Sequence, residues 1–286
     1  SSDLPKLYNL EQDYGSFIGG SIKKRKEKKD LLEQKATKAV FSIKGGLKNL
    51  ILALYHTAGK AHFLFNVSRL HVKPLHQQFE ITFRHDGVLR KIKARRVIST
   101  VGAYELPEIF PFLKHTTSRI IASLPYAKVV QAAVGFKKWE GPELNGFGGL
   151  VPHIEKRDIL GALFMSAFLP ERAPAGGQLF AIFLGGMRRP EMFDKTDQEL
   201  TEIIEKEMKQ MFQIDHFNPD LLKFSRYSYA IPQYGKESGL RLEAIRNIEQ
   251  QYKGLTIAGN LKDGIGMADR IKQAAKIAQK INGERK

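Results

Sequence analysis

The chain has 286 residues, 42% of them hydrophobic and 27% charged, an ordinary balance for one large or two modest globular domains. It contains no cysteine, which excludes disulfides, thiolate metal sites and a cysteine nucleophile, and its eight histidines lack metal-ligand spacing. The net charge of +16, part of it in the run at 23–29, is interpreted as a solvated basic surface; the sharper alternatives are an anionic membrane surface or an acidic substrate, and no nucleic-acid motif is present.

The N-terminal part of the chain predicts helix, then strands. Residues 1–35 favour a helix and a charged linker, and an apolar-rich helix is expected from Leu47 to about Gly59. Period-two alternation and the Asp86-Gly87 turn predict an antiparallel meander. The expected strands are 62–67, 70–72, 79–83, 89–94 and 96–101.

The middle of the chain is richer in strands. Apolar runs bounded by Gly or Pro predict strands at 129–136, 159–168, 179–184 and 221–231. The capping box Thr196-x-x-Glu199 predicts a helix to about Phe212, and a second helix is expected at 240–252. Strands and helices mix without strict alternation. We therefore expect an α+β (mixed α/β) fold, in which a sheet with helices on one side is inserted between two segments of another domain.

Near the C-terminus, an apolar strand at 255–258 is followed by a glycine loop and a helix. Gly259, Gly264 and Gly266 lead into a helix with an apolar stripe through Ile271 to Ile281. A glycine loop before a helix N-terminus suits a backbone that approaches an anion or a cofactor ring. The pattern is neither GxGxxG nor GxxxxGK, and a plain strand-to-helix turn with glycines for packing is the alternative.

Eight stretches, in order along nearly the whole chain, resemble the protoporphyrinogen oxidases of the flavin amine-oxidase superfamily. They are LEQDYGS at 10–16, Phe41 with GGL at 45–47, RVIST at 96–100, GFGGLVP at 146–152, FLPERAP at 168–174, GGMRRPE at 185–191, AIPQY at 230–234 and the loop and helix at 255–281.

The resemblance implies an FAD enzyme that oxidises a porphyrinogen to a porphyrin in haem biosynthesis. It implies a helical membrane-associating remnant with a basic linker at 1–39, FAD-domain segments at 40–104 and 254–286, and a substrate domain at 105–253. Family members begin with a GxGxxG segment, which does not occur here. The chain therefore resembles the C-terminal portion of such an enzyme, and we expect it to be inactive and to lack FAD on its own.

The resemblance also implies site residues. Cofactor contacts are expected from the backbone of Val67, from Tyr227, where family members carry Trp nearby, and from Ile265, Gly266 and Met267 at the flavin ring. The substrate pocket is expected to include Phe147, Gly148, Leu150 and Phe183. Val67 is explained equally well as a core residue, and Phe183, considered alone, is better explained as ordinary core of the sheet. No catalytic side chain and no metal are assigned, because flavin oxidation needs a hydride path rather than a covalent nucleophile.

Two other readings stay open. One is another flavin amine oxidase with an amine or carotenoid substrate, against which the GFGGLVP and LPERAP stretches argue. The other is a non-catalytic basic module that binds an anionic membrane or nucleic acid. If the chain belongs to a porphyrinogen oxidase, we expect a porphyrinogen substrate, no nucleic-acid partner and a cytoplasmic location. Peripheral association with the inner face of an anionic membrane and formation of a homodimer are left open. Protoporphyrinogen and coproporphyrinogen are not separated by the sequence.

Overall fold

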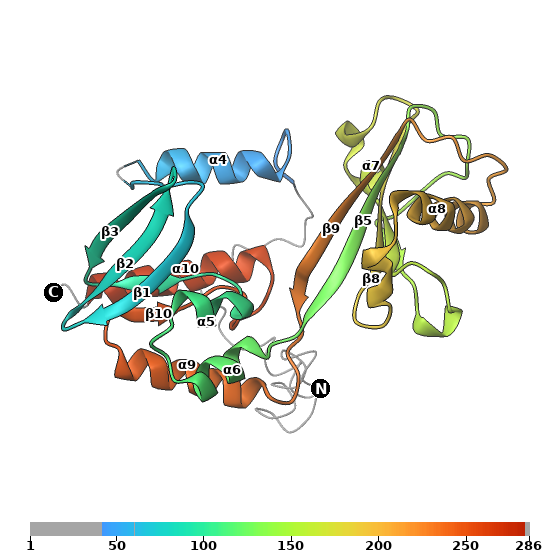
Figure 1. The fold of residues 1–286 in the computed structure, drawn as a ribbon. Helices are drawn as coiled ribbons and strands as arrows, with labels where there is room; N and C mark the ends of the chain where they lie inside the picture. The colour runs from blue at the N-terminus through green and yellow to red at the C-terminus, as the bar shows by residue number, and fades with distance from the viewer. Residues whose placement is uncertain (1–41, 60, 284–286) are drawn as a thin grey trace, which may run out of the picture. The chain divides into compact units, whose positions relative to one another are not determined.

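The computed structural model describes residues 42–59 and 61–283, in two compact units (Figure 1). Ser1–Leu124 with Gln233–Lys286 forms the first unit, and Pro125–Pro232 forms the second. The inserted segment is therefore shorter than the predicted 105–253. Residues 105–124 and 233–253 belong to the first unit, where helix α6 (His115–Ala122) packs against both α5 (Leu106–Ile109) and α9 (Ser238–Gln251). The predicted segment 1–39 lies outside the described residues.

The first unit contains the antiparallel meander predicted from the sequence. Its strands are β1 (Ser68–Leu75), β2 (Gln78–His85) and β3 (Val88–Ala94). The Asp86-Gly87 turn has positive φ at both residues, 51° and 75°, as a two-residue hairpin requires. The predicted strand at 62–67 is wrong: the segment pairs with no strand, Asn66 has a positive φ of 56°, and pairing begins at Ser68.

A two-stranded parallel sheet and several helices complete the first unit. Strand β4 (Val97–Ser99) pairs with β10 (Leu255–Ile257), which is far away in the sequence. The core here is formed by buried side chains of these strands and helices, among them Leu106, Phe110, Ile121, Ile245, Leu255 and Ile257. The helices are α4 (Leu47–Thr57), α5 (Leu106–Ile109), α6 (His115–Ala122), α9 (Ser238–Gln251) and α10 (Met267–Gly283).

Two of these helices bury almost nothing. Helix α4 has no buried residue, although it carries Leu47, Ile51 and Leu54. Helix α10 buries only Gln273, so the apolar stripe that the sequence predicted for it is exposed at Ile271 and at the alanines. An amphipathic helix normally buries its apolar stripe. Both helices therefore present apolar surface that the described residues leave uncovered.

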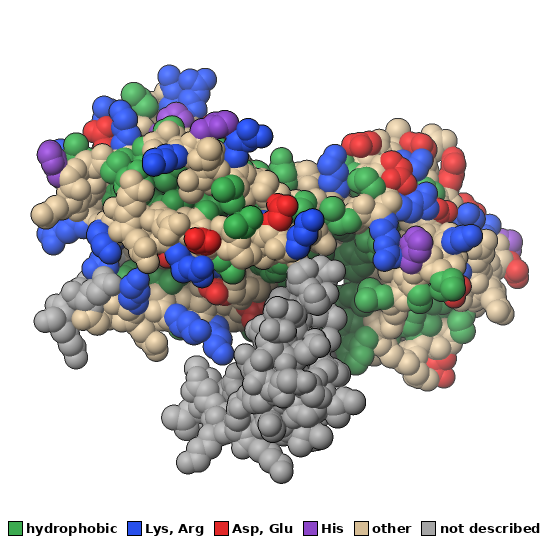
Figure 2. All heavy atoms as spheres, turned by 90° about the horizontal axis from the view of Figure 1, so that it is seen from below, with side chains coloured by type: hydrophobic (Ala, Val, Ile, Leu, Met, Phe, Trp, Pro, Cys, Tyr) green, Lys and Arg blue, Asp and Glu red, His purple; other side chains and the backbone are tan. Residues whose placement is uncertain are grey.

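Charged side chains are spread over the face of the molecule seen in Figure 2. On the face seen in Figure 2, Lys and Arg side chains of the described residues lie among Asp and Glu side chains and are not gathered in one patch. No helix within 42–59 and 61–283 is long and apolar enough to cross a membrane.

The second unit is a five-stranded sheet covered on one face by helix α8 (Asp197–Phe212). Its strand order is β6-β7-β8-β5-β9, and all neighbours are antiparallel. The predicted strand at 159–168 ends early: it pairs only as β7, and residues 165–168 form the short helix α7. The strands are β5 (Tyr126–Phe136), β6 (Gly148–Leu150), β7 (Gly161–Phe164), β8 (Gln178–Gly185) and β9 (Leu221–Pro232), and α7 is Met165–Phe168.

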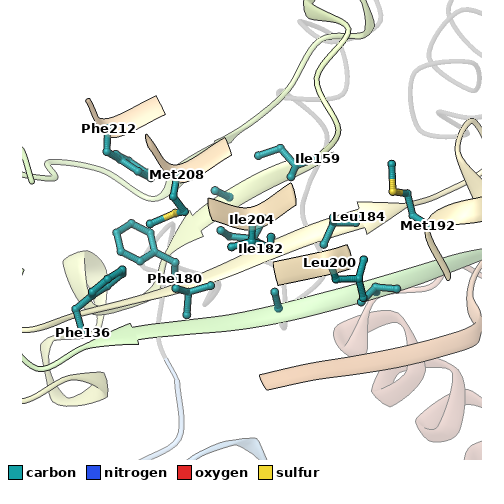
Figure 3. Packing of buried hydrophobic residues seen from close by; sticks show 14 residues of the cluster. Phe136, Ile159, Phe180, Ile182, Leu184, Met192, Leu200, Ile204, Met208 and Phe212 are labelled. Carbon is teal, nitrogen blue, oxygen red and sulfur yellow. The ribbon is translucent and has the colours of Figure 1, made fainter. Parts of the chain in front are cut away.

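The core of the second unit lies between the sheet and α8 (Figure 3). Phe180 is fully buried and contacts the rings of Phe136, Trp139 and Phe212 at centroid distances of 5.0–6.2 Å. The helix contributes Leu200, Ile204, Met208 and Phe212.

Helix α8 begins where the sequence predicted. The Thr196 hydroxyl accepts from Glu199 N–H at 3.2 Å, and Thr196 N–H donates to the Glu199 carboxylate at 2.8 Å, which confirms the capping box.

Candidate functional site

The glycine loop after β10 is held against the neighbouring strand. Ala258 N–H donates to the Ser99 carbonyl at 2.7 Å. Gly259 follows with φ of +92°, and a Cβ there would lie 2.8 Å from the Thr100 carbonyl oxygen. Only glycine fits, because both the backbone angle and the space exclude a side chain.

Side chains of Gln273 and Arg270 in α10, and of Asp263 in the loop itself, hold the rest of the loop by hydrogen bonds. Gln273, buried in α10, accepts from Gly259 N–H at 2.9 Å and from Arg270 Nη1 at 2.8 Å, and it donates to Asp263 at 2.7 Å. Arg270 Nη2 donates to the Lys262 carbonyl at 2.8 Å. These contacts give the loop a defined shape, and the sequence analysis missed both side chains.

Tyr234 supports the same loop from outside the helix. Its hydroxyl lies 2.5 Å from the Asn260 carbonyl oxygen and 3.2 Å from that of Gly264, so it can donate to one of them at a time. Tyr234 is the last residue of the AIPQY stretch at 230–234, which resembles the family. That resemblance was the sequence signal that could have identified Tyr234.

The start of α10 combines exposed apolar side chains with backbone donors. Ile265 and Met267 are both about half exposed, and they flank Gly266. The first N–H groups of any helix lack intrahelical acceptors. Gly266 N–H is already taken, because it lies 3.3 Å from the carboxylate of Asp269. The donors left for a ligand include those of Met267 and the residue after it.

Asp269 was not singled out from the sequence. It stands three residues after Gly266, the spacing at which an acidic side chain reaches back to a helix start. It also explains Gly264, which has φ of +95° and where a Cβ would collide with the Asp269 carboxylate.

Val67 lies elsewhere in the first unit, half-buried just before β1. The segment before it is exposed and aromatic: Phe63 lies 4.6 Å from Tyr55 of α4 and 6.2 Å from Phe65, centroid to centroid. Backbone contacts at Val67 are accessible because residues 61–67 pair with no strand.

In the second unit, the face of the sheet opposite α8 carries most of the predicted substrate residues. Directly paired residues of antiparallel strands share a face. One row across the sheet joins Leu150 to Gly161, Gly161 to Phe183 and Phe183 to Gln131. Gly148 pairs with Leu163 in a parallel row on the same face. Within the second unit this face has no covering helix, and Leu150 is 84% exposed.

Phe183 is therefore not part of the core. The core takes Phe180, Ile182 and Leu184 of β8, whereas Phe183 points to the opposite face and stays half-buried. Tyr227 of β9 pairs with Val129, two residues along β5 from Gln131, and is 48% exposed. Tyr227 shares the open face with Phe183.

Phe147 precedes β6 and is 53% exposed, as expected for an aromatic residue flanked by glycines. Its ring lies 4.9 Å from that of Phe168, and its carbonyl accepts from Phe164 N–H at 3.0 Å. Gly148 has φ of +109°, and a Cβ there would collide with the Ala162 carbonyl. The turn that presents Phe147 at the sheet edge therefore depends on glycine.

The predicted residues thus form two groups, each described within its own unit. Val67, Ile265, Gly266 and Met267 belong to the first unit, and Phe147, Gly148, Leu150, Phe183 and Tyr227 to the second. Within the described ranges, no three His, Asp or Glu side chains are placed to hold a metal ion.

The profile of the family described as "Flavin containing amine oxidoreductase" matches residues 1–282. The chain belongs to this family of flavin-containing amine oxidoreductases. It is 25% identical to the chloroplastic protoporphyrinogen oxidase of Nicotiana tabacum over 97% of this chain and 54% of that protein. It is 26% identical to human protoporphyrinogen oxidase and 24% to coproporphyrinogen III oxidase of Staphylococcus aureus, over 99% of this chain and 61% of each.

Solved structures agree on the fold. A protein of Exiguobacterium sp. 255-15, named as a candidate protoporphyrinogen oxidase, matches with a TM-score of 0.76 and 18% identity over 98% of this chain and 58% of that chain. Putrescine oxidase matches with a TM-score of 0.62 and 12% identity over 84% of this chain and 52% of that chain. The mixed α/β fold predicted from the sequence is confirmed. The chain spans about half the length of the curated relatives it matches.

The residues at the start of α10 fit a flavin ring. Because Gly266 carries no side chain, backbone is exposed there between the apolar side chains of Ile265 and Met267. Its φ is not positive, so the backbone angle alone does not require glycine at this position. A flat ring with a polar edge suits such a site, because the ring packs on Ile265 and Met267 while helix N–H groups face the edge.

Proposed function

We propose that this chain is the C-terminal part of an FAD-dependent porphyrinogen oxidase, in which the first unit holds the flavin and the second unit holds the substrate. The observation that carries the proposal is the open sheet face of the second unit, where Gly148, Leu150 and Phe183 lie beside Gly161. A flat, largely apolar macrocycle suits an apolar face with glycine where the ring passes close.

In the first unit, Ile265, Gly266 and Met267 would contact the flavin ring, and the backbone of Val67 would contact the adenine. The flavin, when bound, accepts a hydride from a carbon of the substrate. The N–H groups at the start of α10 would stabilise negative charge on the bound flavin. The Asp269 carboxylate would repel that negative charge. The hydrogen bond that it accepts from Gly266 N–H at 3.3 Å would weaken the repulsion.

In the second unit, Phe147, Leu150 and Phe183 would orient the macrocycle and exclude water from it. The row partners Gln131 and Ser225 are polar groups on this face, together with Tyr227 and Lys223 in the neighbouring rows, and Gln131 and Ser225 would accept or donate hydrogen bonds without taking part in bond breaking. We assign no catalytic acid or base: the transferred hydrogen would leave the carbon as hydride, and the pyrrole N–H proton lost with it would pass to solvent.

The two exposed helices of the first unit support a further point. Helices α4 and α10 leave apolar side chains uncovered, and the relatives are about twice as long as this span. We propose that additional polypeptide with the GxGxxG segment covers these helices and completes the flavin site. The chain on its own would then be colourless and inactive.

The test uses two proteins, the chain by itself and the open reading frame that contains it. The expected result is stoichiometric flavin absorbance and fluorescent porphyrin formation only in the longer protein. Supplying protoporphyrinogen and coproporphyrinogen side by side assigns the substrate. A longer protein that binds flavin but oxidises putrescine and neither porphyrinogen would replace this proposal with the amine-oxidase alternative.

Location and partners follow from the same proposal. We propose a cytoplasmic enzyme that associates peripherally with anionic membranes through the basic run at 23–29, which lies outside the described residues. Flotation with anionic but not neutral vesicles, at low salt, is the expected result. Equal flotation with both would leave the run as a solvated surface.

A further inference from the structure

A cavity of about 250 Å³ lies in the second unit, and none of the residues predicted to contact porphyrinogen lines it. Its apolar lining, here called the floor, includes Ile159 and Leu160, just before β7, and Gly185 at the end of β8. Its walls are strongly basic. The ionisable lining side chains are His153, Lys156, Arg157, Asp158, Arg188 and Arg189.

The acidic groups at this cavity already have cationic partners. Glu207 of α8 is buried and accepts from Arg157 Nε at 2.7 Å and from Asp158 N–H at 3.1 Å. Asp158 in turn binds Arg189 and lies 3.2 Å from Lys206 Nζ. Burial opposes the charged form of Asp158, but these two cations outweigh it and lower its pKa. Asp158 is therefore favoured in its ionised form and is shared between Arg189 and Lys206.

Lys156 and Arg188 are the cations left over. Both are exposed, and neither forms an ion pair with an acid among residues 42–59 and 61–283. The imidazole of His153 lines the same cavity. Arg157, Arg189 and Lys206 are matched by three acidic partners, Glu207, Asp158 and Glu191, so the excess positive charge at the cavity comes from Lys156 and Arg188.

Two backbone turns with positive φ place Lys156 and Arg188 at the cavity. Lys156 has φ of 51°, a left-handed conformation that is unfavourable for a lysine, and its N–H is held by the His153 carbonyl at 3.1 Å. Arg188 follows the Gly185-Gly186 turn, where both residues have positive φ and Gly186 N–H donates to the Lys128 carbonyl at 2.7 Å. Two independent turns thus bring Lys156 and Arg188 to one cavity.

We propose that this cavity binds the phosphate group of a small ligand. A guanidinium and an ammonium with no acidic partner suit a dianionic oxyanion better than a monocarboxylate, and guanidinium binds phosphate oxygens in a fork. The apolar floor accepts a carbon substituent next to the phosphate. None of the residues assigned to flavin or porphyrinogen lines the cavity, so the proposal does not depend on the proposed function.

Calorimetric titration with inorganic phosphate, pyrophosphate, glycerol phosphate and a nucleoside monophosphate, at constant ionic strength, tests this. The test variant is Lys156→Gln with Arg188→Gln. The control variant, Lys114→Gln with Arg119→Gln, removes the same charges from exposed positions in the first unit. We expect saturable binding that weakens at least about tenfold in the test variant and less than about twofold in the control.

Tighter binding of one organic phosphate than of free phosphate identifies the source of the group. Two results would overturn the proposal. The first is no saturation up to about 10 mM, where a site of millimolar affinity would be nearly full. The second is an equal loss in test and control variants, which would mean that only the net charge of the protein matters. Thermal midpoints of both variants show that each is folded, because all four side chains are exposed.

Discussion

Replacing Gly259, Gly87 or Gly266 of the first unit with alanine distinguishes glycines that the fold requires from a glycine that leaves room for a cofactor. The three variants should differ in the stability that they lose. At Gly259, alanine meets both a φ of +92° and the Thr100 carbonyl oxygen at 2.8 Å. At Gly87, φ is +75° but nothing lies within 4 Å of a Cβ. At Gly266, φ is not positive, and the nearest atom is the mobile carboxylate of Asp269 at 3.1 Å.

The magnitudes follow from these differences. Left-handed strain on a non-glycine residue costs about 1–2 kcal/mol, and forcing an atom into packed backbone adds about 1–3 kcal/mol. Gly259→Ala should therefore lose about 2–5 kcal/mol and Gly87→Ala about 1–2 kcal/mol. Gly266→Ala should stay within about 1 kcal/mol, because the weaker helix start and the stiffer unfolded chain offset each other.

Differential scanning calorimetry of the three variants measures the order. One kcal/mol shifts the midpoint of a domain of this size by about 2–4 °C. We expect Gly259→Ala to melt lowest, Gly87→Ala next and Gly266→Ala close to the original protein. A Gly266→Ala midpoint as low as that of Gly259→Ala would refute the reasoning, because Gly266 would then be needed for the fold itself.

Three further predictions concern other parts of the chain. Phe180→Ala should cost about 3–5 kcal/mol in urea unfolding of the second unit, whereas Phe183→Ala, on the open face three residues away, should cost less than about 2 kcal/mol; equal losses would mean that Phe183 is core. Glu199 has a pKa lowered from 4.5 to about 2, first by Thr196 N–H and then by Lys195. Its folded pKa lies below its unfolded one, so its stabilising effect is full above about pH 4.5 and disappears toward pH 2. Glu199→Gln should therefore be less stable than the original at pH 7 and equally stable near pH 2, and a difference independent of pH would contradict the capping-box account. Asp269→Asn should make the flavin bound to the complete protein easier to reduce, because a negative charge next to the ring edge is removed; an unchanged reduction potential would place Asp269 away from the flavin.

The sequence predicted features that depend on neighbouring residues. The start of α8 follows from Thr196 and Glu199 alone, three residues apart, and the hairpin at Asp86-Gly87 needs only a two-residue turn. Both are local, so no knowledge of the rest of the chain was needed.

Features that depend on distant partners were missed. The strand expected at 159–168 ends at Phe164, where the buried Ser166 side chain instead accepts from Leu179 N–H at 2.9 Å. The strand expected at 62–67 finds no partner, and alternation of residues cannot reveal that.

The candidate site shows the same division. Resemblance placed Gly148, Leu150 and Phe183 in one pocket, but only the pairing of β6, β7 and β8 shows that they share a face with Gly161 and Gln131. Gln273 lies in a stripe of exposed alanines and is the only buried residue of α10. Its bond to Gly259 spans fourteen residues and has no sequence signature.

Turnover per bound flavin in Gly266→Val, in the complete protein, tests the central claim most directly. The matched control is Gly239→Val, at a helical glycine in α9 where a Cβ meets no atom within 4 Å. If the start of α10 faces the flavin edge, the branched side chain holds the ring off its donors, and porphyrin formation per flavin should fall about 10²–10³-fold. The control should keep its turnover, and both thermal midpoints should fall by a similar small amount. Normal turnover per bound flavin in Gly266→Val, with a lowered midpoint, would show that this loop is structural and that the flavin edge lies elsewhere.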